Sequence, residues 1–196
     1  MATKSKLLAC GMLLLLVVAF YAWSKRSINV EIAGVSFKFP AQVVVSSGEA
    51  VEGLDRNSGA FVVLPNGPYH GNWGLLLQSS KDRGGDGMPP GLKENLSKGD
   101  QHFSKTPFGW FACDGNCGRE AWFFHRVPNK ADSTYSVGTV VCFDTDICKL
   151  FLSYKDVDVQ VSVERQKVSE ASEVMRQVPG LLGQYDVASK DAMKQK

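Results

Sequence analysis

Residues 157–163 read Val-Asp-Val-Gln-Val-Ser-Val, so that every second side chain is an apolar valine and those between are polar. This period of two is typical of a β-strand packed against a core, because successive side chains of a strand point to opposite faces. The run 150–154 just before it is also apolar, and the polar pair Lys155-Asp156 separates the two. The pattern predicts two strands joined by a tight turn.

The same alternation appears near the start of the chain. Residues 28–32 and 35–39 each alternate between apolar and polar side chains, with Ala33-Gly34 between them and Pro40 after them, which predicts a hairpin. Shorter strand signals follow at 43–45, 61–64, 73–78, 110–112, 121–125 and 134–143. Short strands separated by turn residues favour an antiparallel sheet over β-α-β units.

A helix is expected near the C-terminus. Ser169 is a suitable N-cap, and Glu170 and Glu173 would place negative charge in the first turn, where the helix dipole favours it. The apolar stripe of this helix would consist of Val174, Val178, Leu181 and Leu182. Pro179-Gly180 predicts a kink or an end in it, and the polar residues 186–196 are expected to form a fraying tail.

A long polar stretch, residues 79–106, interrupts the strand pattern and is rich in glycine and proline, with a short helix expected at 92–97. A loop of this length in a compact domain is usually functional or mobile. No linker divides the chain after residue 26. We therefore predict one α+β domain, mostly antiparallel β, over residues 27–185, with a C-terminal helix.

The first 26 residues differ from this domain. Residues 7–23 carry no charge, and as a helix they would span about 25 Å, close to the thickness of a membrane's hydrocarbon core. We expect residues 1–26 to be an uncleaved signal anchor in a bacterial inner membrane, with the domain in the periplasm. Two alternatives remain, which are a signal peptide cleaved after Ala22 and a lipoprotein signal at Cys10.

The net charge of +2 is unevenly distributed. Residues 1–26 contain four basic and no acidic side chains, which leaves 22 − 4 = 18 basic and 20 acidic side chains in the rest, a net charge of −2. A weakly acidic domain lacks the basic surface that binds a phosphate backbone. We expect no nucleic-acid partner.

Four of the five cysteines lie in the predicted domain, namely Cys113, Cys117, Cys142 and Cys148. An even number of cysteines in an exported domain indicates two disulfides. The spacing favours the local pairs 113–117 and 142–148, each around a turn-rich segment, while the other two connectivities remain open. A four-cysteine zinc site is the rival interpretation, but it lacks Cys-x-x-Cys spacing and would need a reducing compartment.

The sequence contains none of the catalytic motifs Gly-x-Ser-x-Gly, Ser-x-x-Lys and His-Glu-x-x-His. Its three histidines, which lack metal-ligand spacing, are His70, His102 and His125. Asp144-Thr145-Asp146 lacks the later glycine and glutamate of a calcium loop. The glycine-rich run 84–87 leads into Pro89-Pro90 rather than into a phosphate-binding helix. We expect no enzyme activity, cofactor or metal.

Residues 30–40, Val-Glu-Ile-Ala-Gly-Val-Ser-Phe-Lys-Phe-Pro, are followed by the apolar residues 43–45. This opening resembles the start of small periplasmic immunity proteins that are encoded beside antibacterial effectors of type VI secretion systems, over residues 1–65. The resemblance implies a membrane-anchored inhibitor that blocks the active site of an effector such as a lipase or a peptidoglycan hydrolase. The other interpretations are an assembly subunit of an envelope complex, and an envelope hydrolase with His70 or His102 as base.

Inhibitors of this kind bind through rigid loops, because a preorganised loop loses less entropy on binding. Aromatic side chains gather on both sides of the Cys113–Cys117 turn, and an exposed tryptophan there would suit an interface. The predicted partner contacts are Arg83, Asp86, Met88, His102, Trp110, Asp114 and Asn116.

Overall fold

The computed structural model describes residues 26–47, 59–79, 102–114, 121–127, 138–143 and 145–189. Within these residues, β1 (Ser27–Ile32) and β2 (Val35–Pro40) form a two-stranded hairpin. Nine further strands form one antiparallel sheet, in the spatial order β3 (Val44–Ser47), β4 (Gly59–Gly67), β5 (Gly71–Ser79), β11 (Val157–Glu164), β10 (Ile147–Tyr154), β9 (Thr139–Cys142), β8 (Ala121–Phe124), β7 (Phe111–Asp114) and β6 (His102–Lys105). The helical segments η1 (Ala41–Val43), η3 (Arg165–Glu170) and α3 (Ala171–Gly183) accompany the sheet, and residues 187–189 are helical as well.

The valine-rich strand β11 lies inside the sheet, between β5 and β10. Its four valines are buried and share a face with Leu150 and Leu152 of β10, as the alternation predicts. Unlike a strand with one solvent face, β11 also buries polar side chains, among them Asp158, Ser162 and Glu164. The reason is its internal position, since neighbouring strands flank it on both sides. The turn at Lys155-Asp156 joins β10 to β11, with Lys155 at a φ of 53°.

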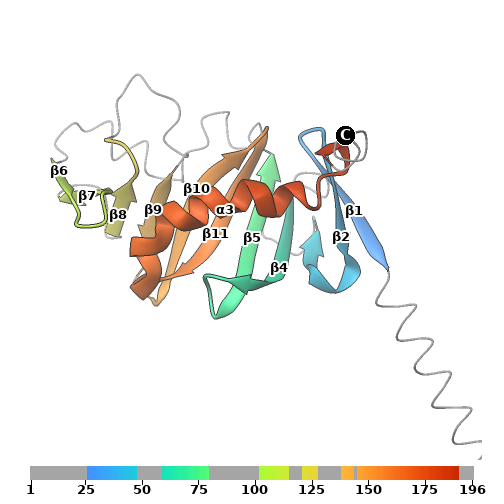
Figure 1. The fold of residues 1–196 in the computed structure, drawn as a ribbon, viewed down its shortest axis with the longest axis horizontal. Coiled ribbons are helices and arrows are strands. Elements are labelled where there is room, and N and C mark those ends of the chain that lie inside the picture. Colours follow the sequence, from blue (N-terminus) through green and yellow to red (C-terminus); the bar gives the residue numbers. More distant parts are fainter. Residues whose placement is uncertain are drawn as a thin grey trace, which may run out of the picture.

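Helix α3 lies across one face of the sheet (Figure 1). Val174, Val178 and Leu182 are buried against the valine face, as the predicted stripe requires, and Leu181 packs beside them. The opposite face of the sheet carries a second apolar cluster of Trp122, Phe124, Val141 and Phe151. The predicted α+β fold, mostly antiparallel β with a C-terminal helix, is confirmed for the described residues.

The predicted cap of the helix is wrong, and of the kink or end predicted at Pro179-Gly180 the end is excluded. Ser169 does not cap α3, because residues 165–170 form η3 and Glu170 occupies the N-cap position without a side-chain hydrogen bond. Pro179 does not end the helix, which continues to Gly183. The buried side chains Val178 and Leu182 hold the chain against the sheet on both sides of the proline.

The β1–β2 hairpin is confirmed, and its Ala33-Gly34 turn has φ angles of 51° and 80°, as a two-residue turn with positive φ at both positions requires. The hairpin lies beside the C-terminal end of α3 (Figure 1). Phe37 forms a β-bridge with Asp186, and the Lys38 amide donates a hydrogen bond to the Tyr185 carbonyl at 2.8 Å. The two ends of the described chain are therefore joined.

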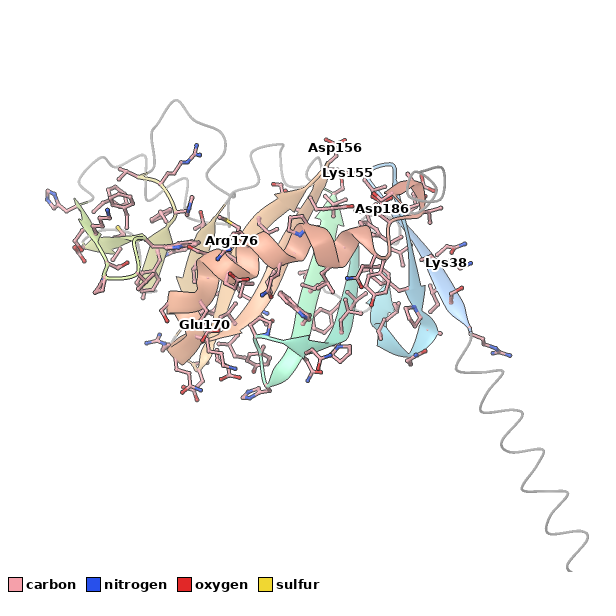
Figure 2. All side chains as sticks on the ribbon, viewed as in Figure 1. Lys38, Lys155, Asp156, Glu170, Arg176 and Asp186 are labelled. Atoms are coloured by element: carbon pink, nitrogen blue, oxygen red, sulfur yellow. A yellow bond between two sulfur atoms is a disulfide. The ribbon has the colours of Figure 1, made fainter. Side chains whose placement is uncertain are left out.

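The polar tail was predicted to fray from residue 186 onward. This prediction is wrong for its first residue, because Asp186 is 1% exposed. Its carboxylate accepts hydrogen bonds from the Tyr154 hydroxyl at 2.9 Å, the Ala188 amide at 3.0 Å and the Ser189 hydroxyl at 3.1 Å. It also forms an ion pair with Lys155, which lies beside it in Figure 2. The side chain of Asp186 thus fixes the chain end to the β10–β11 turn.

The long loop predicted at 79–106 is shorter than expected at its end, because residues 102–105 form the edge strand β6, paired with β7. The expected strand 134–143 is seen as Thr139–Cys142, and residues 128–137 lie outside the described part. The helix expected at 92–97 and the anchor expected at 7–23 also lie outside it. Among the residues that the structure describes, no helix has the length and apolar character to cross a membrane.

Candidate functional site

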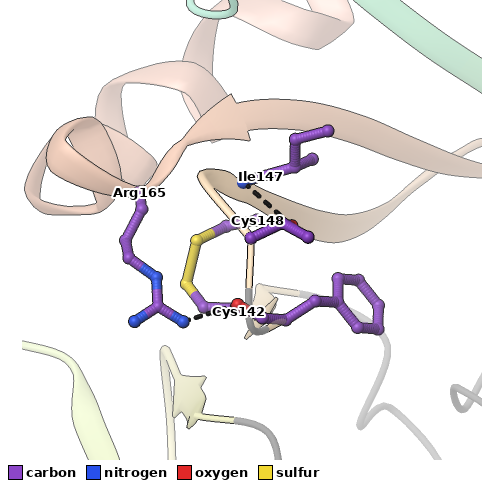
Figure 3. Close-up of a disulfide and its surroundings, with 6 residues drawn as sticks. Cys142, Ile147, Cys148 and Arg165 are labelled. Carbon is purple, nitrogen blue, oxygen red and sulfur yellow. Dashed lines mark hydrogen bonds between the residues drawn. A yellow bond between two sulfur atoms is a disulfide. The ribbon is translucent and has the colours of Figure 1, made fainter.

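A disulfide joins Cys142 and Cys148 as a cross-strand pair between β9 and β10, with the two Cα atoms 4.1 Å apart (Figure 3). The predicted local pairing is confirmed here, and a zinc site built on all four cysteines is inconsistent with it. Cys113 is disulfide-bonded as well. Its predicted partner, Cys117, lies outside the described residues, so that pairing stays a prediction.

The turn between β9 and β10 is also held by Arg165, the first residue of η3. The Arg165 guanidinium donates to the Phe143 carbonyl at 2.6 Å, and the Arg165 amide donates to the Asp146 carbonyl at 2.9 Å. Figure 3 shows Arg165 reaching past the disulfide to the turn. The Phe143 side chain is 39% exposed. The result is an exposed aromatic side chain on a turn with restrained backbone, a suitable arrangement for a protein interface.

Removing this disulfide with the double substitution Cys142→Ala and Cys148→Ala is expected to lower the free energy of unfolding by about 2 kcal/mol, because the bond closes a short loop in the unfolded chain. Urea unfolding of the oxidised full chain in detergent measures the change. Ser153→Ala, at an exposed position of the same strand, is the control and should leave the midpoint unchanged. An unchanged midpoint in the double variant would contradict the expectation.

Two pockets lie beside this turn, and Arg165 and Gln166 line both of them. The first pocket has a volume of about 290 Å³ and is mainly apolar, with further lining residues Phe108, Ala121, Phe123, Cys142, Val168 and Ser169. The second has a volume of about 440 Å³, and all of its lining residues have polar or charged side chains, with His70, Asp146 and Glu164 as the further members; we call it the polar pocket. We call these residues together with Phe143 the two-pocket surface.

The polar pocket contains a carboxylate that stays ionised. Hydrogen bonds from the Gln166 side chain at 2.8 Å and from the His70 amide at 2.7 Å, together with Lys167, lower the pKa of Glu164 to about 2. The same contacts fix the carboxylate in place and connect the β4–β5 turn to the end of β11. The Asp146 side chain is exposed and has no ion pair within the described part of the chain.

Trp110 was predicted to contact the partner, but its burial in the structure contradicts this prediction. Its side chain is 1% exposed, its indole N–H donates to the Ser172 hydroxyl of α3 at 2.7 Å, and its ring packs against His125. Trp110 is a core residue that joins the β6–β7 connection to the helix.

Neither of the two remaining predicted contacts that the structure describes lines either of the two pockets. His102 and Asp114 are exposed and face each other across β6 and β7, at the edge of the sheet. The other four, Arg83, Asp86, Met88 and Asn116, lie outside the described residues. These assignments stay predictions.

Sequence reasoning missed the two-pocket surface because its parts are distant in the chain. His70 and Glu164, which line the polar pocket and are joined by a hydrogen bond, are 94 positions apart. The one available signal was local, namely two cysteines around the Asp-Thr-Asp turn at 144–146. It predicted the disulfide but gave no reason to prefer this turn over the Cys113–Cys117 turn as the contact region.

The closest arrangement to a nucleophile and base is a pair of side chains on the sheet face opposite α3. The Lys149 ammonium donates to the Ser162 hydroxyl at 2.7 Å, and burial lowers the pKa of Lys149. Neither residue lines either of the two pockets. Among the described residues, no three His, Cys, Asp or Glu side chains lie close enough together to hold a metal ion.

No protein-family model matches the chain, and no curated protein matches it in sequence. Its fold is similar to that of Smlt3025, an immunity protein of the Stenotrophomonas maltophilia type IV secretion system. The TM-score is 0.52 at 9% sequence identity, and the match covers 81% of this chain and 92% of the other. At an identity this low, the structural similarity shows a shared fold alone.

Proposed function

We propose that this chain is an immunity protein, a binding protein without catalytic activity that neutralises an antibacterial effector by covering its active site. The observation that carries the proposal is the similarity of fold to an immunity protein over 92% of that protein's length. The two-pocket surface supports it, because it offers an exposed aromatic side chain and two hollows on a restrained backbone.

We further propose that the effector acts in the periplasm as a lipase or peptidoglycan hydrolase, and that residues 7–23 anchor the inhibitor in the inner membrane facing it. The sequence resemblance favours delivery of the effector by a type VI system, whereas the structural neighbour belongs to a type IV system. Inhibition in the periplasm suits both routes, and the disulfide between Cys142 and Cys148 suits an oxidising compartment.

The test is co-expression of the full chain with periplasm-directed hydrolases encoded next to it. Cells making the cognate hydrolase should survive only when the chain is present. Phe143→Asp should weaken protection and lower affinity by roughly 30-fold or more, since an interface hot spot contributes about 2 kcal/mol or more. Val127→Asp, at another exposed apolar position, is the matched control and should protect like the unaltered chain.

Failure to protect against every such hydrolase would contradict the proposal. Purification with several envelope components instead of one hydrolase would indicate the assembly role. Full protection by Phe143→Asp would show that the effector binds elsewhere on the chain.

A further inference from the structure

The two pockets adjoin each other along a shared wall, because Arg165 and Gln166 line both. Each is large enough for a side chain, since about 290 Å³ is equivalent to roughly ten water molecules in the liquid. A partner segment that crosses the wall would place neighbouring side chains in different surroundings. The chemistry of each pocket then specifies which side chains the partner presents.

The first pocket selects an apolar side chain. Phe108 and Phe123 form part of its lining, with ring centroids 5.8 Å apart, and Val168 packs against the main core. Both aromatic rings are partly exposed. An apolar side chain inserted here would remove aromatic surface from water, which is the usual source of affinity at an interface centre.

The second pocket selects a positive charge. Glu164 is ionised and already forms an ion pair with Lys167 at 3.2 Å, so the carboxylate open to a partner's cation is that of Asp146, which is exposed and has no ion pair in the described part of the chain. The backbone at Asp146 is fixed by the hydrogen bond to Arg165, so its position does not need to be ordered on binding. Arg165, a cation in the lining, directs its guanidinium to the Phe143 carbonyl.

We propose that the segment of the partner bound here carries a Lys or Arg directly beside a large apolar residue. The apolar side chain enters the Phe108–Phe123 pocket, and the cation enters the pocket lined by Asp146 and Glu164. This inference rests on the proposed function in one respect, namely that the two-pocket surface faces the effector.

A disulfide-constrained random peptide library, displayed on phage, tests the inference without the effector. The target is the full oxidised chain, immobilised in detergent micelles. The enriched peptides should place Lys or Arg next to Phe, Leu or Trp. Synthetic versions should bind Asp146→Lys roughly tenfold or more weakly, because two like charges would then meet.

Asp156→Lys is the matched control, because Asp156 is an exposed carboxylate at the opposite end of β10 (Figure 2). It should change the affinity less than twofold. Ser169→Trp, which adds a large side chain to the lining of the apolar pocket, should also abolish binding. The milder change Asp146→Asn should weaken binding by a smaller factor, which keeps the test valid should the lysine variant fold poorly.

Enrichment of acidic peptides, absence of any enriched motif, or equal binding to Asp146→Lys and the unaltered chain would overturn the inference. These outcomes are separable from failure of the proposed function. If the chain protects cells and peptide binding does not change in Asp146→Lys, the proposed function stands and the inference about the partner segment is wrong. If the chain selects the expected peptides but protects against no effector, the peptide-binding surface stands and the proposed function is wrong.

Discussion

Asp186→Ala is expected to lower the free energy of unfolding by about 3 kcal/mol. The substitution removes the acceptor of the buried Tyr154 hydroxyl and of the Ala188 and Ser189 amides, and each buried donor left without an acceptor costs about 1–3 kcal/mol. It also releases Lys155 from its ion pair. Urea unfolding measures the change, and Glu31→Ala, at an exposed carboxylate of β1, should shift the midpoint little. Equal shifts in the two variants would refute this role of Asp186.

The same carboxylate makes stability depend on pH in acid. Burial alone would raise the pKa of Asp186, but hydrogen bonds from Lys155, Tyr154 and Ser189 outweigh burial and lower the pKa to about 2. A carboxyl group with a lowered pKa in the folded state stabilises the fold above its unfolded pKa, near 4, and loses that contribution as the pH falls towards 2. Stability should therefore fall between about pH 5 and pH 2 more steeply in the unaltered chain than in Asp186→Asn.

Trp110→Ala is expected to have the largest effect on stability, a loss of about 3–5 kcal/mol, because it leaves a cavity where the largest fully buried side chain now packs. In a domain of this size the midpoint of thermal unfolding should fall by about 10 °C. Trp110→Phe keeps most of the volume and removes the hydrogen bond to Ser172 at 2.7 Å, so it should cost much less. If scanning calorimetry shows only a small decrease in the unfolding midpoint of Trp110→Ala, the assignment of Trp110 to the core is wrong.

Features set by near neighbours in the chain were predictable from the sequence. The alternation in 28–39 and 150–163 specified two hairpins, since a period of two and a short turn are local properties. The stripe of α3 followed from its helical spacing. The position of β11 inside the sheet was not predictable, because its pairing with β5 joins residues about 80 positions apart. In the sequence, the polar residues of β11 that are buried in the structure therefore resembled those of a solvent-exposed face.

The candidate site was only partly predictable for the same reason. The spacing of Cys142 and Cys148 predicted their disulfide, which lies next to the apolar pocket. Arg165 belongs to no motif, and its role becomes visible only when η3 is placed beside the β9–β10 turn. Trp110 shows the opposite error, since an aromatic residue near a cysteine turn was expected to be exposed and is buried.

The order of the strands has a consequence for how the chain matures. Among the described residues, strand β11 is the last strand in sequence, yet it alone connects β3, β4 and β5 to the other half of the nine-stranded sheet. While a ribosome or a translocation channel still holds the residues after about 157, β5 has an edge without its native neighbour. Asp186 and Tyr185 emerge later still, and without them the β1–β2 hairpin lacks its contacts to the chain end. The native sheet therefore forms only after residues 157–164 have been released, when β11 can pair with both β5 and β10.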